Sequence, residues 1–252
     1  MILRKKYSLP LYKHQVKFIA YIFFRILVFI FWLIPFPLLY MLSDGLRFLL
    51  KNILRYRVSV IQKNIEFVFP DKSQQWRDNI ANQFYKNFVD ILLESIKGLS
   101  ISGDKLIKRY RFRNPELMDA IYNENKHVIV FSQHQNNWEW APLCLGLQIK
   151  HHIVGVVKLL SNPYINTFLQ NGRSGNNVSV VPTLKVGSYF KKLQVKEKYE
   201  ALVFIADQRP SGRETKIPVT FMGHQVNFHG GAARYAIFSC LLYTSPSPRD
   251  RG

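Results

Sequence analysis

The chain has 252 residues, 48% of them hydrophobic, which is enough for one sizeable core with an appendage. Its formal net charge is +19, which favours an anionic partner: nucleic acid, an anionic membrane surface, or an acidic substrate or carrier. Only two cysteines occur, Cys144 and Cys240, so the composition excludes a disulfide framework and a zinc site built from cysteines.

An apolar stretch from Phe18 to Leu42 follows a short basic segment. A membrane-spanning helix needs about 20 apolar residues, so the length suffices. Arg25, Pro35 and Pro37 interrupt the stretch, which leaves open whether it spans the bilayer or lies in the interface. In both cases we predict an N-terminal membrane anchor over residues 1–45.

Two helical patterns follow the anchor. Between residues 46 and 66, basic residues alternate with apolar ones, as on a helix at an anionic membrane surface or on an ordinary solvated helix face. Ser73 can cap a long helix over residues 74–99. The apolar stripe of this helix predicts core packing, with Trp76, Ile80, Phe84, Phe88, Ile91, Leu92, Ile96 and Leu99.

After Gly103, helices alternate with short strands. This order predicts an α/β fold, with a mostly parallel central sheet covered by helices, in one domain over residues 46–239. We expect strands at residues 127–131, 152–157, 178–181, 201–206 and 217–221, and helices at residues 115–123, 137–147, 163–171 and 186–194.

The last thirteen residues, 240–252, look foreign to the rest of the chain. The string CLLYTSPSPRD breaks the preceding amphipathic pattern, and its back-translation matches an adaptor used in sequencing libraries. The alternative is an ordinary Ser/Pro-rich tail. We predict that residues 240–252 are an adaptor-derived tail and do not belong to the fold.

The candidate site follows the first predicted strand, in the stretch HVIVFSQHQNNWEW (127–140). His134 and Glu139 are five residues apart, so on one straight helix they would lie about 140° apart. They can meet if His134 lies on the strand-to-helix turn and Glu139 in the first helical turn, with Asn136 as N-cap. The other interpretation is a plain Asn-x-x-Glu capping box without chemistry.

Other polar residues follow the later strands. Asp207 and Arg209 come directly after the fourth strand, and ligands of parallel sheets bind beyond the carboxyl ends of the strands. Arg173 lies in a Gly/Asn-rich turn over residues 172–177, where it could grip a phosphate with two parallel hydrogen bonds. The alternatives are a strand-end turn residue for Asp207 and a solvated loop residue for Arg173.

Four motifs in this order resemble the lipid A biosynthesis acyltransferases, the lauroyl and myristoyl transferases of the lysophospholipid acyltransferase superfamily. The motifs are the His-x4-acid pair His134…Glu139, the segment NGRSGNNVSVVP around Arg173, FIADQRP (204–210) with FMG (221–223), and HGGAARYA (229–236). The resemblance covers nearly all of residues 15–239. The interior Asn136-Asn137-Trp138 departs from the apolar residues of many members, and the family's C-terminal portion is missing.

The resemblance implies a membrane-bound enzyme on the cytoplasmic face of the inner (plasma) membrane. It would move a fatty acyl chain from acyl carrier protein (acyl-ACP, or acyl-CoA, as co-substrate) to a hydroxyl of a phosphorylated glycolipid, with no other cofactor. His134 would be the general base and Glu139 would orient it. Arg173, Asp207, Asn137 and Arg209 would bind substrate.

Metal and nucleic acid have little support in the sequence. His151 and His152 are adjacent and would face opposite ways on a strand, so we expect no metal site. Only the charge favours nucleic acid, because no nucleic-acid-binding motif occurs, and we expect none as partner. Two other hypotheses stay open: an acyltransferase for another lipid acceptor, such as glycerol phosphate or lysophosphatidate, and a basic membrane-binding protein without catalysis.

Overall fold

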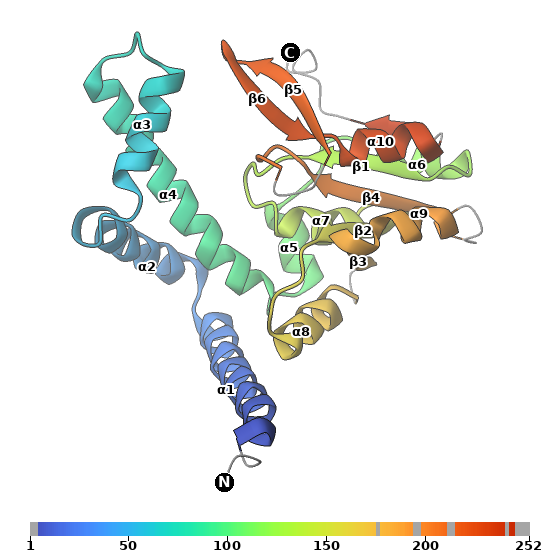
Figure 1. Cartoon of the computed structure of the whole chain (residues 1–252), viewed down its shortest axis with the longest axis horizontal. Coiled ribbons are helices and arrows are strands. Elements are labelled where there is room, and N and C mark those ends of the chain that lie inside the picture. Colours follow the sequence, from blue (N-terminus) through green and yellow to red (C-terminus); the bar gives the residue numbers. More distant parts are fainter. Residues whose placement is uncertain (1–4, 175–176, 194–197, 211–214, 240–241, 245–252) are drawn as a thin grey trace. The chain divides into compact units, whose positions relative to one another are not determined.

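The computed structural model describes residues 5–174, 177–193, 198–210, 215–239 and 242–244. The chain forms two compact units (Figure 1). One unit consists of residues 1–26 together with 101–252, and the other of residues 27–100. These boundaries differ from the predicted division at residue 45, because the helices up to Ser100 form a unit without the sheet.

The first unit is built around a parallel sheet, which confirms the predicted α/β fold. Its strand order is β3-β2-β4-β1, and every neighbouring pair is parallel (Figure 1). A fifth strand, β7, pairs in parallel with β1 and comes from the segment predicted to be foreign. The strands are β1 (Val128–Ser132), β2 (His152–Val157), β3 (Val178–Pro182), β4 (Glu200–Ile205) and β7 (Leu242–Thr244).

Helices cover the sheet, because both faces of its central strands are apolar. Ile129, Val154 and Leu202 lie in one buried cluster with side chains of α9 and α10. The residue before each of them is also fully buried, and its side chain points to the opposite face of the sheet, so both faces are buried. These residues are Val128, Ile153 and Ala201. The helices of this unit are α5 (Gly103–Arg109), α6 (Pro115–Asn123), α7 (Trp140–Gly146), α8 (Pro163–Ser174), α9 (Val186–Leu193) and α10 (Gly231–Ser239), with the 3-10 turn η2 (Thr183–Lys185).

The predicted fifth strand does not join the main sheet. Residues Lys216–Phe221 form β5, which pairs with β6 (His224–His229) in an antiparallel hairpin. Met222 and Gly223 both have positive φ, 50° and 81°, as a two-residue type I′ turn requires. The predicted strand is confirmed, but its partner β6 was not predicted, because Met-Gly is a weak turn signal and the polar strand β6 carries little hydrophobic periodicity.

The second unit is helical. It contains the end of α1 (Lys5–Leu33), then α2 (Phe36–Phe48), the π-helix η1 (Leu49–Ile53), α3 (Val58–Val68) and α4 (Gln74–Gly98). The Oγ atom of Ser73 accepts a hydrogen bond from the backbone N–H of Trp76 at 3.3 Å, so the predicted cap is confirmed.

The predicted stripe of α4 was wrong by one position. The buried face is Ala81, Tyr85, Val89 and Leu93, whereas Phe84 is 44% exposed. Val89 and Leu93 pack against Phe31 and Leu39 from the end of α1 and from α2. Both stripes have helical spacing, and only this packing selects between them.

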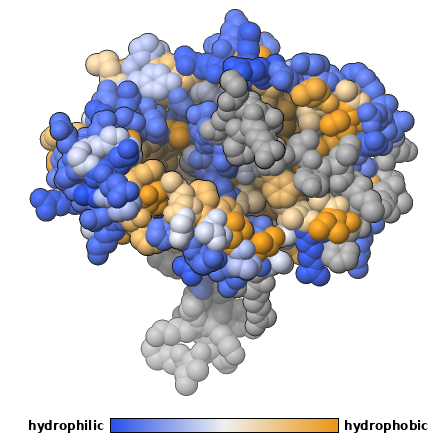
Figure 2. Space-filling model, turned by 90° about the horizontal axis from the view of Figure 1, so that it is seen from above, coloured by the Kyte–Doolittle hydropathy of each residue, from blue (hydrophilic) through white to orange (hydrophobic). Residues whose placement is uncertain are grey.

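Much of the apolar surface of α1 is exposed. Over Lys13–Leu33 the helix has the length and composition to cross a membrane. Arg25 lies on this helix, and its guanidinium group contacts the ring of Phe168 on α8, with its carbon 4.9 Å from the ring centroid. Figure 2 shows that hydrophobic patches interrupt an otherwise hydrophilic surface on the face in view. These features support membrane association.

Candidate active site

The candidate site forms where two neighbouring parallel strands end. β1 and β4 are paired along their length, with Ser132 opposite Ile205. The backbone N–H of Ala206 donates to the carbonyl oxygen of Ser132 at 3.1 Å, which keeps the two chains together beyond the strands. The sequence then places His134 on one chain and Asp207 on the other. Their meeting therefore follows from strand order.

The carboxylate of Asp207 binds His134 at two points. Its Oδ1 lies 2.7 Å from Nδ1 of the ring, and its Oδ2 accepts a hydrogen bond from the backbone N–H of His134 at 2.9 Å. An ionised carboxylate only accepts, so the neutral ring must carry its hydrogen on Nδ1. Nε2 is then left with its lone pair, and it has no hydrogen-bond partner among the described residues. The arrangement is that of an oriented general base.

The indole of Trp138 lies against the ring of His134. The two rings meet edge to face, with centroids 5.0 Å apart. The side chains of His134 and Asp207 are 25% and 34% exposed, so a ligand can reach the pair. No role was predicted for Trp138, although its place four residues after His134 was a usable signal.

Glu139 and Asn137 lie at the start of α7. The helix begins at Trp140 rather than near Asn137, and Glu139 is its exposed N-cap residue. The side-chain oxygen of Asn137 accepts from the backbone N–H of Trp140 at 3.1 Å, and Asn137 is 5% exposed. Asn136 has a φ of 51°. The prediction that it caps the helix was wrong, because the N-cap residue is Glu139. The carboxylate at Nδ1 of His134 is thus that of Asp207, where the sequence predicted Glu139.

Of the two arginines predicted to bind substrate, the structure describes the side chain of Arg209 and only the backbone of Arg173. Arg209 is exposed and lies in the loop after β4, two residues beyond Asp207. The backbone of Arg173 is helical, because α8 continues to Ser174 into the predicted turn. The side chain of Arg173 lies outside the described part of the structure.

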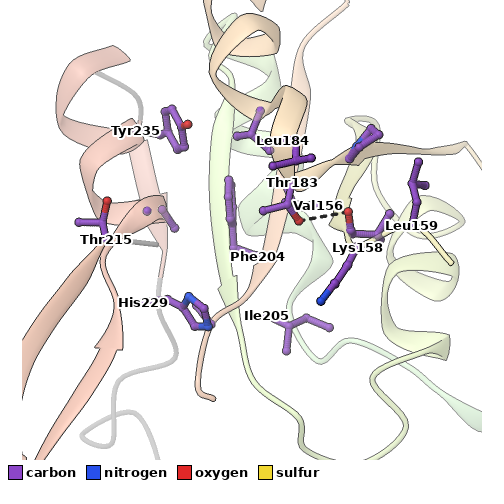
Figure 3. A pocket seen from close by; sticks show the side chains of 16 residues that line it. Val156, Lys158, Leu159, Thr183, Leu184, Phe204, Ile205, Thr215, His229 and Tyr235 are labelled. Carbon is purple, nitrogen blue, oxygen red and sulfur yellow. Dashed lines mark hydrogen bonds between the residues drawn. The ribbon is translucent and has the colours of Figure 1, made fainter. Parts of the chain in front are cut away.

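A cavity of about 790 Å³ opens at the carboxyl ends of β2, β3 and β4, the edge of the sheet at which His134 and Asp207 also lie (Figure 3). His134 and Asp207 themselves do not line it. In Figure 3, Phe204 stands between Tyr235 on one side and Leu184 on the other. The residues Phe204, Ile205 and Ala206 line the cavity and lead directly into Asp207. The last of these lining residues, Ala206, is therefore the chain neighbour of Asp207, which holds His134.

Polar groups of the cavity lie among apolar ones. Lys158 is exposed and lies at the end of β2, and His229 ends β6 on the hairpin side (Figure 3). The hydroxyl of Thr183 donates to the carbonyl oxygen of Val157 at 3.2 Å, which holds the loop after β3 against β2. Sequence reasoning missed Lys158 and His229, although His229 begins the quoted motif HGGAARYA.

Three further observations concern metal ligands and thiols. Within the described residues, no group of three or more His, Cys, Asp or Glu side chains could hold a metal ion. His151 is buried, with Nε2 3.1 Å from the carbonyl oxygen of Lys126, whereas His152 contacts Asn177 and Ser179. Burial raises the pKa of the Cys144 thiol in α7 to about 11, so this thiol is protonated near neutral pH.

The family described as bacterial lipid A biosynthesis acyltransferase matches residues 6–240. The match covers both units and ends where the foreign tail was predicted to begin. No curated protein matches the chain.

Proposed function

Because the chain belongs to the bacterial lipid A biosynthesis acyltransferase family, we propose that it transfers a fatty acyl chain from acyl carrier protein to a hydroxyl group of a lipid A precursor. The observation that carries this proposal is the pairing of His134 with Asp207 at the same edge of the sheet at which a large, mostly apolar cavity opens. A base and an apolar cavity at one edge of the sheet suit a reaction that joins a hydrocarbon chain to a polar acceptor.

The proposed reaction needs one base and no nucleophile from the protein. Nε2 of His134 takes the proton of the acceptor hydroxyl while the oxygen of that hydroxyl attacks the thioester carbonyl. The tetrahedral intermediate then expels the thiolate of the carrier, which takes the proton from the imidazolium. The Asp207 carboxylate orients the ring and stabilises its positive charge while the proton is held. The buried, protonated thiol of Cys144 takes no part.

Glu139 stays the second candidate for the orienting carboxylate. It is exposed and lies five residues after His134, at the first turn of α7. The contacts of Asp207 with both the ring and the backbone of His134 favour Asp207. A carboxylate that binds two groups of one residue limits rotation of the ring more than a carboxylate that binds one.

The acyl chain would occupy the cavity of about 790 Å³, whose lining from Phe204, Leu184 and Tyr235 is apolar or aromatic. Lys158 at this cavity and Arg209 beyond Asp207 would attract the phosphates of the carrier and of the acceptor, with Arg173 as the predicted phosphate-gripping residue. The net charge of +19 suits an acidic carrier and an anionic bilayer. We place the enzyme on the cytoplasmic face of the inner membrane, attached through α1.

The test compares His134→Ala, Asp207→Asn and Glu139→Gln, with Glu124→Gln as control because Glu124 pairs with Lys126 away from the cavity. Purified protein receives acyl-ACP and a lipid A precursor, and mass spectrometry measures the acylated lipid. His134→Ala should lower kcat by about 10²–10⁴-fold. Asp207→Asn should lower kcat to a similar degree with little change in KM, and Glu139→Gln should lower it less.

Wild-type turnover by His134→Ala would overturn the mechanism. A large loss for Glu139→Gln with a small loss for Asp207→Asn would make Glu139 the orienting residue. Glycerol 3-phosphate and lysophosphatidate serve as competing acceptors, and preference for either would change the substrate class. No transfer to any acceptor by the unmodified protein would favour the non-catalytic membrane protein.

A further inference from the structure

A second cavity lies between α3 and α4, within residues 27–100, and has a volume of about 310 Å³. The rings of Phe84 and Phe88 stack with centroids 5.8 Å apart, and Tyr56 stacks on Phe88 at 6.3 Å. This volume holds about ten groups of the size of a water molecule or a methylene. It fits one hydrocarbon chain. The rest of the apolar wall is Val60, Ile61, Ile65 and Ile80.

The turn between η1 and α3 carries two arginines, one of which lies at this cavity. Arg57 lines it, and Arg55 lies two residues earlier. Both have left-handed backbone conformations, with φ of 54° and 48°, which residues other than glycine rarely adopt. Tyr56 between them is fixed, because its N–H donates to the carbonyl oxygen of Leu50 at 2.9 Å and its carbonyl oxygen accepts from the buried Tyr85 hydroxyl. Strained conformations that tertiary contacts maintain recur at ligand-binding turns.

The charge around the turn has one sign. The chain has no acidic residue between Asp44 and Glu66. Neither Arg55 nor Arg57 has a carboxylate partner among the described residues, and the guanidinium carbon of Arg57 lies 5.7 Å from the centroid of the Tyr56 ring. The arginines are therefore available to an anion from outside the chain. The basic residues of this stretch are Arg47, Lys51, Arg55, Arg57 and Lys63.

Large apolar side chains near the turn are exposed. Ile53 and Leu54 directly precede Arg55 and are 62% and 61% exposed, and Val60 at the cavity is 50% exposed. Exposed apolar groups next to basic ones are typical of a surface that meets an anionic bilayer. The ligand that matches a cavity for one chain, two guanidinium groups and this surface is an anionic membrane lipid.

We propose that residues 55–88 hold a binding site for an anionic phospholipid, with one acyl chain between α3 and α4 and the phosphate on Arg55 and Arg57. The site is distinct from the proposed acyl-donor cavity in the other unit and needs no catalysis. Its occupant would be a resident lipid of the bilayer, such as phosphatidylglycerol. It would give the enzyme a specific attachment to anionic membranes in addition to the apolar surface of α1.

The experiment uses the whole chain in mild detergent, with phosphatidylglycerol or phosphatidylcholine of the same acyl chains added. Native mass spectrometry counts the lipids that each chain retains. We expect one phosphatidylglycerol per chain, retained in preference to phosphatidylcholine. Since each basic residue near an anionic lipid contributes about a fivefold change in affinity, the double variant R55Q/R57Q should bind phosphatidylglycerol about 30-fold more weakly. Val60→Trp should reduce retention while leaving the charge unchanged, because the indole fills part of the cavity.

The matched control is K72Q/K86Q, which removes the same charge from lysines that do not line the cavity. An equal loss in this control would overturn the proposal in favour of general electrostatic attraction. Equal retention of both lipids, or full competition by inorganic phosphate, would overturn it as well. A dimer that Val60→Trp dissociates would make a second copy of the chain the occupant. Circular dichroism of each variant identifies loss of folding, and thermal stabilisation of the unmodified protein by phosphatidylglycerol but not phosphatidylcholine provides a test without substitutions.

Discussion

The ammonium group of Lys97, near the end of α4, donates a hydrogen bond to the carbonyl oxygen of Phe31 in α1 at 2.7 Å. The same group donates to the carbonyl oxygens of Trp32 and Ile34 at 2.9 and 2.8 Å. The last carbonyls of a helix lack partners within it and carry partial negative charge. The side chain of the buried Lys97 therefore caps the carboxyl end of α1 and links it to α4.

Replacement of Lys97 by methionine keeps the length of the side chain and removes all three donors. We expect the free energy of unfolding of this unit to fall by about 2 kcal/mol, because buried carbonyl oxygens lose their partners. Urea unfolding in detergent measures the change. Lys86→Met, on an exposed position of the same helix, should change stability by less than about 0.5 kcal/mol. Equal effects of the two substitutions would contradict the capping role.

Gly230, which connects the hairpin β5-β6 to α10, lies close to the side chain of Ile217. A Cβ atom added at Gly230 would lie 2.8 Å from Cγ1 of Ile217. Gly230→Ala should therefore destabilise the fold by about 1–3 kcal/mol and shift the hairpin. Because Thr215 and His229 of this region line the large cavity, acyl-donor KM should rise.

The double variant G230A/I217A tests the cause of this effect. Removal of the Ile217 side chain relieves the two contacts with Cγ1 and Cδ1 and leaves only the contact with Cγ2 of Thr215 at 3.0 Å. The double variant should recover most of the lost stability, and thermal unfolding of the four proteins in the cycle gives the coupling between the two positions. Simple addition of the two losses would show that the contact with Ile217 is not the reason.

The burial of His151 leads us to expect that the free energy of unfolding falls in mild acid. Burial lowers its pKa below the ordinary value of 6.5, although the bond to the Lys126 carbonyl oxygen and the charge of Asp119 oppose the shift. Its Nδ1 is buried without a hydrogen-bond partner among the described residues. The unfolded chain therefore binds the proton more tightly. The stabilisation is complete above pH 6.5 and declines as pH falls below it.

The slope from one such group is at most about 1.4 kcal/mol per pH unit. His151→Gln should flatten the dependence of the unfolding midpoint on pH between pH 7 and pH 5, whatever its effect on stability at pH 7. His14→Gln, at an exposed position, should leave the dependence unchanged. An unchanged pH dependence in His151→Gln would assign the acid sensitivity to other groups.

The sequence by itself determined the four strands of the sheet and the alternation of helices and strands along the chain. From this alternation followed the prediction that the strands are parallel. Runs such as Val128–Phe131 are short, rich in β-branched residues and apolar on both faces, which favours strands of a covered sheet. It also determined the cap at Ser73 and the apolar helix α1, since capping and membrane length are local properties. The family match over residues 6–240 agrees with the motifs that the sequence displayed.

Only the tertiary structure decided which stripe of α4 is buried and which carboxylate meets His134. Two stripes one residue apart have the same periodicity, and the packing of Val89 and Leu93 on Phe31 selected one. Glu139 is five residues from His134 and Asp207 is 73 residues away. The distant residue makes the contact because β1 and β4 are neighbours in the sheet and their ends converge. Strand order is a property of long-range pairing, which spacing along the chain does not contain.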